Sequence, residues 1–309
     1  PKTGVGFSPD LVWIKNREGS NHHLLFDTVR GAGHDRELRS DSTGAEGGAS
    51  LKGYDWLSSF DSDGFTTTWS GSNVPYYTDQ NGYAYVAWCW DAGANNASTG
   101  HSSVAYTGNG GTQKISGFPF SPDLLWIKDR SVARGSVLFD TVRGAEKYFR
   151  TNDTSAEAVS GTPTVTSFDK DGFITGNNAA CNNTSETYVA WAWDAGDSDP
   201  VTNTQGTVDS TVKASTTNGF SIVKHTYNGE TNPISIGHGL SQAPDFIIQK
   251  QLNATANWRV FHKDLTSGKL LSLNTTDAES TETDISSVGA TTFSSSATGV
   301  SGRELIQYC

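Results

Sequence analysis

The amino-acid sequence predicts an all-β protein built from tandem β-sandwich domains with short strands and many turns. One phrase that is typical of a buried strand occurs three times, and Leu-rich helical runs are missing. Gly, Ser, Thr and Asn are abundant between short apolar runs, which favours strands joined by turns. The chain of 309 residues exceeds one typical hydrophobic core, so we expect several domains.

The three copies of this phrase define the expected domains. Phe7–Arg17 (FSPDLVWIKNR) returns as Phe120–Arg130 (FSPDLLWIKDR) and, more weakly, as Ser241–Gln251 (SQAPDFIIQKQ). Further phrases follow each copy in the same order. We therefore predict repeat 1 over residues 1–97, repeat 2 over residues 98–199, and repeat 3, with a linker ahead of it, over residues 200–309.

Repeats 2 and 3 each open with a strand and turn, here called the lead-in strand, that begins near Ser102 and at Phe220. Repeat 1 has no such segment. The chain also starts at Pro1 and contains no Met. We therefore expect repeat 1 to be cut short at its N-terminus and repeat 3 at its C-terminus, within a longer protein.

Two strands of each repeat are expected to be buried on both faces. Leu11–Ile14 (LVWI) is apolar at every position, so the side chains on both faces of this strand need cover. Tyr85–Trp90 (YVAWCW) and its counterpart YVAWAW in repeat 2 have the same character and predict a second central strand. The Asp-Gly pairs in FDSDGF and FDKDGF predict tight hairpin turns, while Gly196–Asn218 has the composition of a linker.

Charge and cysteine content exclude several classes of partner. The net charge of −11 opposes a nucleic-acid groove or an anionic membrane surface, and no apolar run is long enough to span a bilayer. Three widely spaced cysteines form neither a disulfide framework nor a zinc site. Because Ala192 stands in repeat 2 where Cys89 and Cys309 stand in the others, that position is expected to be small and buried. We expect no metal and no cofactor.

The charged residues that recur are expected to form structural ion pairs at a corner of each sandwich. The phrase FDTVRG contributes Asp27 and Arg30 in repeat 1 and Asp140 and Arg143 in repeat 2; Arg17 and Arg130 follow the repeated strand. The alternative is a ligand-binding Arg/Asp cluster. Repeat 3 has His262 where the aspartates fall, which opposes one site shared by all repeats.

We expect no enzyme activity. The recurring aspartates fall at strand ends and turns, and no nucleophile elbow, phosphate loop or Cys–His arrangement is evident. DSDG and DKDG lack the further oxygen ligands of a calcium loop, which leaves the turn interpretation.

Aromatic residues peculiar to repeat 1 are the candidate ligand or interface residues. They lie in polar stretches that repeat 2 lacks, and they are Tyr54, Trp56, Trp69, Tyr76, Tyr77 and Tyr83. Aromatic rings on loops stack on sugars and anchor protein interfaces. Contact with a glycan or receptor and packing against their own domain or a neighbouring subunit are the alternatives.

The ordered motifs of repeat 3 (GFSIVKHTYNGETNPISIGHGLSQAPDFIIQK, WRVFHKDL, LLSLNTT) resemble a repeat domain of unknown function in phage tail fibre and virion structural proteins, mainly of marine phages. FSPDLVWIKNR, LLFDTVRG and YVAWCWDAG look like a sister version of that domain. The resemblance implies a jelly-roll, lectin-like or SPRY-like sandwich, a structural or receptor-binding role, a homo-oligomer, and no catalytic residues.

We therefore expect a virion structural protein of a tailed phage, in a tail fibre or a capsid-attached fibre, that takes part in host attachment. It would be assembled in the host cytoplasm and reside in the extracellular particle. The expected partners are further copies of the chain, in a trimer or another symmetric oligomer, and other virion proteins, with a host-surface glycan as a further candidate. The alternatives are a carbohydrate-binding module of a secreted bacterial protein or adhesin, and a polysaccharide depolymerase.

Overall fold

The computed structural model describes residues 1–48, 55–69, 77–93, 100–162, 164–296 and 301–309. In these residues one short helix accompanies 26 strands. Trp13, Trp126 and Phe246, which mark the three copies of the repeated phrase, all lie in strands. The prediction of an all-β fold with several sheets is confirmed.

Repeat 1 contains two antiparallel sheets. One has the strand order β4-β3-β2-β7 and the other has the order β1-β6-β5. The strands are β1 (Lys2–Thr3), β2 (Leu11–Asn16), β3 (Leu24–Asp27), β4 (Leu38–Arg39), β5 (Asp55–Asp61), β6 (Gly64–Trp69) and β7 (Tyr85–Trp90).

Repeat 2 has the same plan with a longer main sheet, β13-β12-β11-β10-β16-β8, facing a second sheet, β14-β15-β9. Its helix α1 (Ala179–Asn182) is capped by Asn178, whose side chain accepts a hydrogen bond from the backbone of Ala180. The strands are β8 (His101–Thr107), β9 (Gln113–Ser116), β10 (Leu124–Asp129), β11 (Val137–Asp140), β12 (Lys147–Arg150), β13 (Ala158–Val159), β14 (Val165–Asp169), β15 (Gly172–Thr175) and β16 (Thr187–Trp193).

Repeat 3 has an eight-stranded main sheet, β17-β18-β19-β26-β21-β22-β23-β24, and a two-stranded second sheet, β20-β25. The strands are β17 (Val201–Asn203), β18 (Ser210–Ser215), β19 (Phe220–Tyr227), β20 (Ile234–Gly237), β21 (Phe246–Gln251), β22 (Arg259–His262), β23 (Lys269–Ser272), β24 (Ser280–Thr281), β25 (Thr292–Ser295) and β26 (Arg303–Tyr308).

The Asp-Gly hairpins occur where the sequence predicts them. Asp61 pairs directly with Gly64, and Asp169 pairs with Gly172. Glycine is required after the turn because a third strand lies close: a Cβ on Gly64 would stand 2.0 Å from the carbonyl oxygen of Lys2. At Gly172 the same atom would stand 1.9 Å from the carbonyl oxygen of Ile115.

The segment predicted to be a linker, residues 196–218, differs from that prediction. It contributes strands β17 and β18 to the main sheet of repeat 3, where Val212 is buried. Its many threonines are β-branched and suit an extended backbone. Composition alone therefore did not distinguish a polar edge strand from a linker.

Each repeat encloses its own core between its two sheets, which we call a sandwich core. In repeat 1 this core contains Val12, Ile14 and Phe26; in repeat 2 it contains Leu125 and Phe139. The sandwich core of repeat 3 includes Val223, Ile247 and Phe293. Apart from Phe293, which lies in β25 of the second sheet, these residues come from one face of each main sheet.

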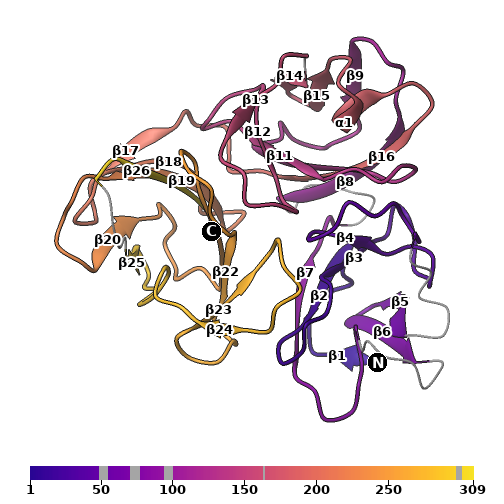
Figure 1. The fold of residues 1–309 in the computed structure, drawn as a ribbon, viewed down its shortest axis with the longest axis horizontal. Helices are drawn as coiled ribbons and strands as arrows, with labels where there is room; N and C mark the ends of the chain where they lie inside the picture. The colour runs from indigo at the N-terminus through magenta and orange to yellow at the C-terminus, as the bar shows by residue number, and fades with distance from the viewer. Residues whose placement is uncertain (49–54, 70–76, 94–99, 163, 297–300) are drawn as a thin grey trace.

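The opposite faces of the three main sheets meet in a single shared core. Trp13 and Trp88 of repeat 1, Trp126 and Trp191 of repeat 2, and Trp258 and Tyr308 of repeat 3 belong to it. The Trp13 ring lies 4.2 Å from Trp88 and 6.1 Å from Trp126, measured between ring centroids. Figure 1 shows the resulting ring of three lobes around a common centre. The strands are apolar on both faces because each face contributes to a different core.

We predict that Trp258→Ala destabilises the whole ring. Trp258 is fully buried, packs edge-on against Phe149 of repeat 2, and donates its indole N–H to the backbone of Arg150 at 3.0 Å. Loss of so large a buried side chain should lower the free energy of unfolding by about 3–5 kcal/mol. Urea unfolding followed by both fluorescence and circular dichroism would measure this change.

The matched control is Val201→Ala at an exposed strand position, where the side chain is 61% exposed. It should shift the free energy of unfolding by less than about 0.5 kcal/mol. A loss of under about 1 kcal/mol in Trp258→Ala would contradict a shared core that includes this residue.

Candidate binding site at the centre of the ring

Three buried lysines, one per repeat, join the repeats in a closed cycle. Lys15 donates from Nζ to the carbonyl of Thr276 in repeat 3 at 3.1 Å. Lys128 donates to the carbonyl of Thr43 in repeat 1 at 3.1 Å, and Lys250 donates to the carbonyl of Thr154 in repeat 2 at 2.9 Å. The three threonines occupy equivalent positions in their repeats. The lysine of repeat 1 therefore contacts repeat 3, that of repeat 2 contacts repeat 1, and that of repeat 3 contacts repeat 2. The ring therefore has approximate threefold symmetry within one chain.

A backbone hydrogen bond accompanies each lysine. The N–H groups of Glu279, Glu46 and Glu157, each three residues after the threonine, donate to the carbonyls of Arg17, Arg130 and Leu252 at 2.9, 2.9 and 2.8 Å. Two junctions add an ion pair across the boundary: Arg17 with Glu279 at 3.1 Å, and Arg130 with Glu46 at 2.7 Å. The third junction has Leu252 in place of the arginine, and this ion pair is lost there.

The ion pairs that the sequence predicts inside the FDTVRG phrase are present and buried. The Nε of Arg30 lies 2.6 Å from Asp27 Oδ2, and both side chains are fully buried. Arg143 pairs with Asp140 in the same way and covers the ring of Phe149 at 4.1 Å. A buried ion pair of this kind needs every donor occupied, and the remaining guanidinium N–H groups of Arg30 reach Arg36 O, Glu46 and Leu25 O.

The same aspartates also hold the neighbouring repeat. Trp191 of repeat 2 donates its indole N–H to Asp27 of repeat 1 at 2.9 Å, and the Tyr308 hydroxyl of repeat 3 donates to Asp140 of repeat 2 at 2.7 Å. At the third junction Trp88 meets the ring of His262 edge-on at 6.0 Å. The aspartates that the sequence assigns to a corner of one sandwich therefore also serve the junctions.

The loop aromatics do not gather into one described surface. Tyr77 is buried against its own sandwich core and stacks on His22 at 6.1 Å, and Trp56 packs against the same core. Tyr83 is 43% exposed. Tyr54 and Tyr76 lie outside the described residues, and so does the side chain of Trp69, whose backbone ends strand β6.

A hollow of about 670 Å³, here called the axial hollow, opens where the three repeats meet. Aromatic side chains of all three repeats border it, and they include Trp13, Trp88, Trp90, Trp126, Trp193 and Phe246. Polar residues such as Asp91, Asn218 and Asp245 border it as well. Aromatic walls with a few polar groups suit an apolar or amphipathic occupant.

Two indole donors that belong to the wall of the axial hollow have no hydrogen-bond partner among the described residues. They are Nε1 of Trp88 and Nε1 of Trp126. Each follows from a departure from the repeat pattern. His262 replaces the aspartate that would accept from Trp88, and Ser136 stands where His23 accepts from the equivalent Trp13 at 2.9 Å. Both indoles belong to the shared core as well as to the wall of the axial hollow.

Neither cysteine that borders the axial hollow is an activated nucleophile. Burial raises the pKa of Cys89 and of Cys309 to about 12, so both are protonated thiols near neutral pH. A reactive cysteine requires a lowered pKa. Burial also lowers the pKa of His101, another residue of the wall, to about 3.

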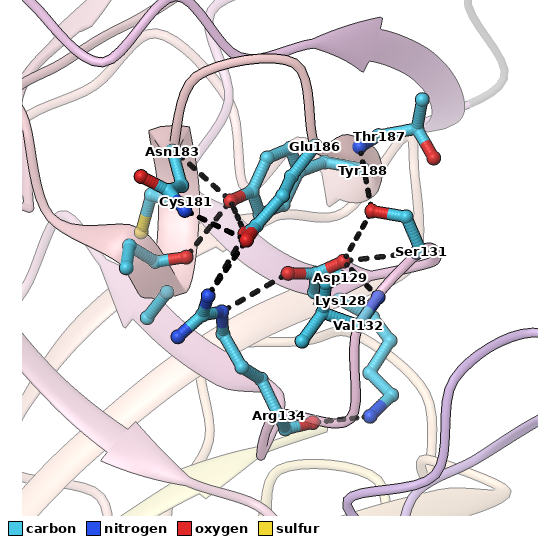
Figure 2. Close-up of polar contacts among 12 residues, drawn as sticks. Lys128, Asp129, Ser131, Val132, Arg134, Cys181, Asn183, Glu186, Thr187 and Tyr188 are labelled. Atoms are coloured by element: carbon cyan, nitrogen blue, oxygen red, sulfur yellow. Dashed lines mark hydrogen bonds and ion pairs between the residues drawn. The ribbon is translucent and has the colours of Figure 1, made fainter.

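A cluster of acids and an arginine in repeat 2 is the strongest candidate for acid–base chemistry outside the axial hollow (Figure 2). Arg134 contacts Asp129 at 3.1 Å and both oxygens of Glu186 at 2.9 and 3.0 Å. Burial raises the pKa of Asp129. Burial acts in the same direction on Glu186, but hydrogen bonds from Asn183 and Arg134 outweigh it and lower the pKa.

The oxygens of both acids are already occupied. Asp129 Oδ1 accepts from the backbone of Ser131 and of Val132, both at 2.9 Å, which is a turn cap that Asn16 provides in repeat 1. Glu186 also accepts from Asn183 at 2.7 Å. An arrangement of this kind stabilises the turn between β10 and β11 rather than presenting a free acid to a substrate.

Within the described parts of the chain, no group of three or more His, Cys, Asp or Glu side chains is placed to hold a metal ion. In the same parts, no helix has the length and apolar character that crossing a membrane requires.

The fold and the shared aromatic core define the class of protein: a closed ring of three fused β-sandwich repeats with the aromatic core on its axis. Comparison with family models then identifies the family. The chain belongs to the family described as Domain of unknown function (DUF7483), whose model matches residues 1–105 and 96–309. Neither the curated proteins nor the solved structures contain a significant match.

Sequence analysis did not identify the junction lysines as contacts between repeats. A signal was present, because Lys15, Lys128 and Lys250 are the charged residues that recur at one position of an otherwise buried strand in all three repeats. Sequence alone could not show that their acceptors lie in another repeat.

We predict that acid weakens the ring through its buried histidines. Burial lowers the pKa of His23 to about 3, and the neutral ring accepts from Trp13 and bonds the Ser272 carbonyl of repeat 3 at 3.1 Å. The unfolded chain therefore binds more protons as the pH falls below about 6.5, and the free energy of unfolding should fall between pH 6.5 and 4. Urea unfolding across this range should show a shallower slope for His23→Asn.

The control is His34→Asn, which lies away from this junction and should keep the slope of the parent protein. An unchanged slope in His23→Asn would contradict the role assigned to His23.

We also predict a rise in stability on the alkaline side. Burial lowers the pKa of Lys15, Lys128 and Lys250 to about 8, while unfolded lysine titrates near 10.5. Between these values the unfolded state binds more protons, so the free energy of unfolding should rise by on the order of 1 kcal/mol per lysine from pH 8 to 9.5. Lys15→Met should reduce this rise, as measured by urea unfolding.

The control for this experiment is Lys263→Met, because the Lys263 side chain is 55% exposed. The same slope in the parent protein and in Lys15→Met would contradict the prediction.

Proposed function

We propose that this chain is a structural module of a tailed-phage particle, in a tail fibre or a capsid-attached fibre, where it contributes to attachment to the host surface. The support from sequence is the resemblance of its ordered motifs to repeats of phage fibre and virion proteins. Membership in a family of unknown function neither adds to nor opposes this assignment.

The single observation that carries the proposal is the closed ring of three sandwiches. The recurring charged residues make contacts inside the ring: Lys15 donates across a junction between repeats, and Arg143 pairs with Asp140 within repeat 2. A chain whose recurring polar side chains form contacts inside the ring is suited to a structural role in which the repeats must stay together. Its approximate threefold symmetry also suits a place on the axis of a symmetric fibre, because symmetric partners present equivalent contacts.

The net charge of the chain favours a place on the outside of the particle over contact with nucleic acid. The net charge of −11 opposes contact with the packaged genome and keeps an exposed module soluble. Host contact would then come from the surface of the ring, where Tyr83 is exposed on repeat 1. The partners in this proposal are other virion proteins, further copies of the chain and a host-surface glycan.

Location in the particle is the decisive test. Purified particles from a culture that carries the gene would be analysed by mass spectrometry and labelled with antibodies raised against the 309-residue chain. We expect the chain to co-purify with capsid and tail proteins and the label to decorate fibres in electron micrographs. Recovery of the chain only as a secreted bacterial protein, absent from particles, would contradict the proposal.

Two assays on the purified chain separate the alternatives. A carbohydrate-binding module predicts glycan binding by an isolated monomer, and a depolymerase predicts release of oligosaccharide from capsule or lipopolysaccharide. We expect no release of oligosaccharide. Release that is abolished by substituting one Asp or Glu would replace the proposal with an enzyme.

A further inference from the structure

Strand β7 of repeat 1 differs from its two counterparts in having an open edge. In the described part of the chain, β7 ends the sheet β4-β3-β2-β7, whereas β16 lies between β10 and β8 and β26 lies between β21 and β19. The neighbours β8 of β16 and β19 of β26 are the lead-in strands of repeats 2 and 3, and β7 has no counterpart of them among the described strands. Figure 1 shows β8 alongside β16 and β19 alongside β26.

The burial of β7 agrees with a missing neighbour. Ala190 and Ala192 of β16 are fully buried, while the equivalent Ala87 and Cys89 of β7 are only half-buried. The sequence predicts cover on both sides for YVAWCW, and that cover is present in repeat 2 but not among the described strands of repeat 1.

Among the described strands, none pairs with the outer edge of β7, so the backbone groups on this edge have no ladder partner there. In repeat 3 the equivalent Cys309 exchanges two hydrogen bonds with Ser221 of the lead-in strand, each of 2.9 Å. Because alternate residues of an antiparallel strand face the same neighbour, Cys89 and Ala87 turn their N–H and C=O groups toward the open edge. An exposed strand edge of this kind is a template for an added strand.

The axial hollow extends along this edge. Its wall includes five consecutive residues of the β7 region, Ala87 to Asp91, whose side chains alternate between the two faces of the sheet. The run lies along the open edge of β7, so the hollow follows the strand there. In repeat 2 the corresponding place is filled: the His101 ring of the lead-in strand lies 4.9 Å from Trp193.

The chain path shows where such a strand would connect. In repeat 2 the lead-in strand β8 runs into β9, which pairs with β15 through Ile115↔Phe173 and Ser116↔Gly172. In repeat 1, β1 pairs with β6 through Lys2↔Phe65 and Thr3↔Gly64, which are the equivalent positions. β1 therefore occupies the place of β9, and a strand on the edge of β7 would finish close to Pro1.

We infer that the edge of β7 is an acceptor site for an extended peptide strand of the lead-in type, which pairs antiparallel with Ala87 and Cys89 and inserts side chains into the axial hollow. The two lead-in strands define what the site takes. His101 or Phe220 begins the pattern, Ser102 or Ser221 follows, and Val104 or Val223 ends it. The occupant therefore has an aromatic residue or His at the first position, Ser at the second, any residue at the third and Val at the fourth.

Each position of this pattern has a physical reason. The first side chain would stand opposite Trp90 and extend the aromatic wall, as His101 does opposite Trp193. The serine would stand opposite Cys89, where both known serines are fully buried and leave room for little more than a hydroxyl. The valine would stand opposite Ala87 and join the sandwich core of repeat 1. Main-chain hydrogen bonds would supply affinity and the alternating side chains specificity, as in β-strand addition.

The test joins the occupant to the protein. Residues 100–113, which contain β8 and the turn that follows it, are placed directly ahead of Pro1, so that the added strand is held at high local concentration. Hydrogen exchange is read at single amides by mass spectrometry. We expect exchange at Ala87 and Cys89 to slow by about tenfold or more and the midpoint of urea unfolding to rise. Amides of β16, which already has its neighbour, should not change.

The matched control is the same fusion with Pro in place of the first serine, which removes the N–H that would pair with Cys89. It should leave exchange at Ala87 and Cys89 and the unfolding midpoint at the values of the unfused chain. A free peptide of residues 100–108 (GHSSVAYTG) should give the same protection at high concentration.

Two results would overturn the inference. The first is a serine-containing fusion that changes neither the exchange at Ala87 and Cys89 nor the unfolding midpoint. The second is an unfused chain in which these amides are already protected, with sedimentation showing dimers, because a second copy would then cover the edge. Strand binding at the edge of β7 does not depend on a role in a phage particle, so either proposal can fail without the other.

Discussion

The ring depends on one constraint, which is that the strand repeated in each sandwich is apolar on both faces. One face forms the sandwich core and the other has to be covered by the remaining two repeats. A fully buried Trp such as Trp13 or Trp191 removes about 150–250 Å² of surface from water, which contributes about 4–6 kcal/mol before losses of conformational entropy. The shared core therefore makes separation of the repeats costly.

The junction lysines determine the order in which the three repeats are arranged around the shared core. Lys15, Lys128 and Lys250 are buried, and burying a charge is unfavourable unless its donors are occupied. Each ammonium group finds carbonyl acceptors in its own repeat and in one neighbour, so only one cyclic order of the repeats satisfies all three. The lysines thus specify the arrangement, while the aromatic side chains supply most of the stabilisation.

Local structure could be predicted from sequence because it depends on neighbours in sequence. The apolar run at Leu11–Ile14, the Asp-Gly hairpins and the order of the phrases predict strands, turns and repeats. The pattern shows that Trp13 needs cover on both faces but not what provides it. The acceptor of Lys15 lies 261 positions away, which no local pattern reveals. The polar context of the loop aromatics left open whether they bind a partner or pack on their own domain, and Tyr77 is buried beside His22 in its own domain.

Three departures from the repeat pattern break the symmetry of the ring: His262, Leu252 and the open edge of β7. The measurement that tests the ring most directly is native-state hydrogen exchange of the three repeated strands. A shared core predicts that the slowest amides of β2, β10 and β21 exchange with one common free energy of opening. Three separate values, with one repeat opening while the others stay protected, would contradict the account.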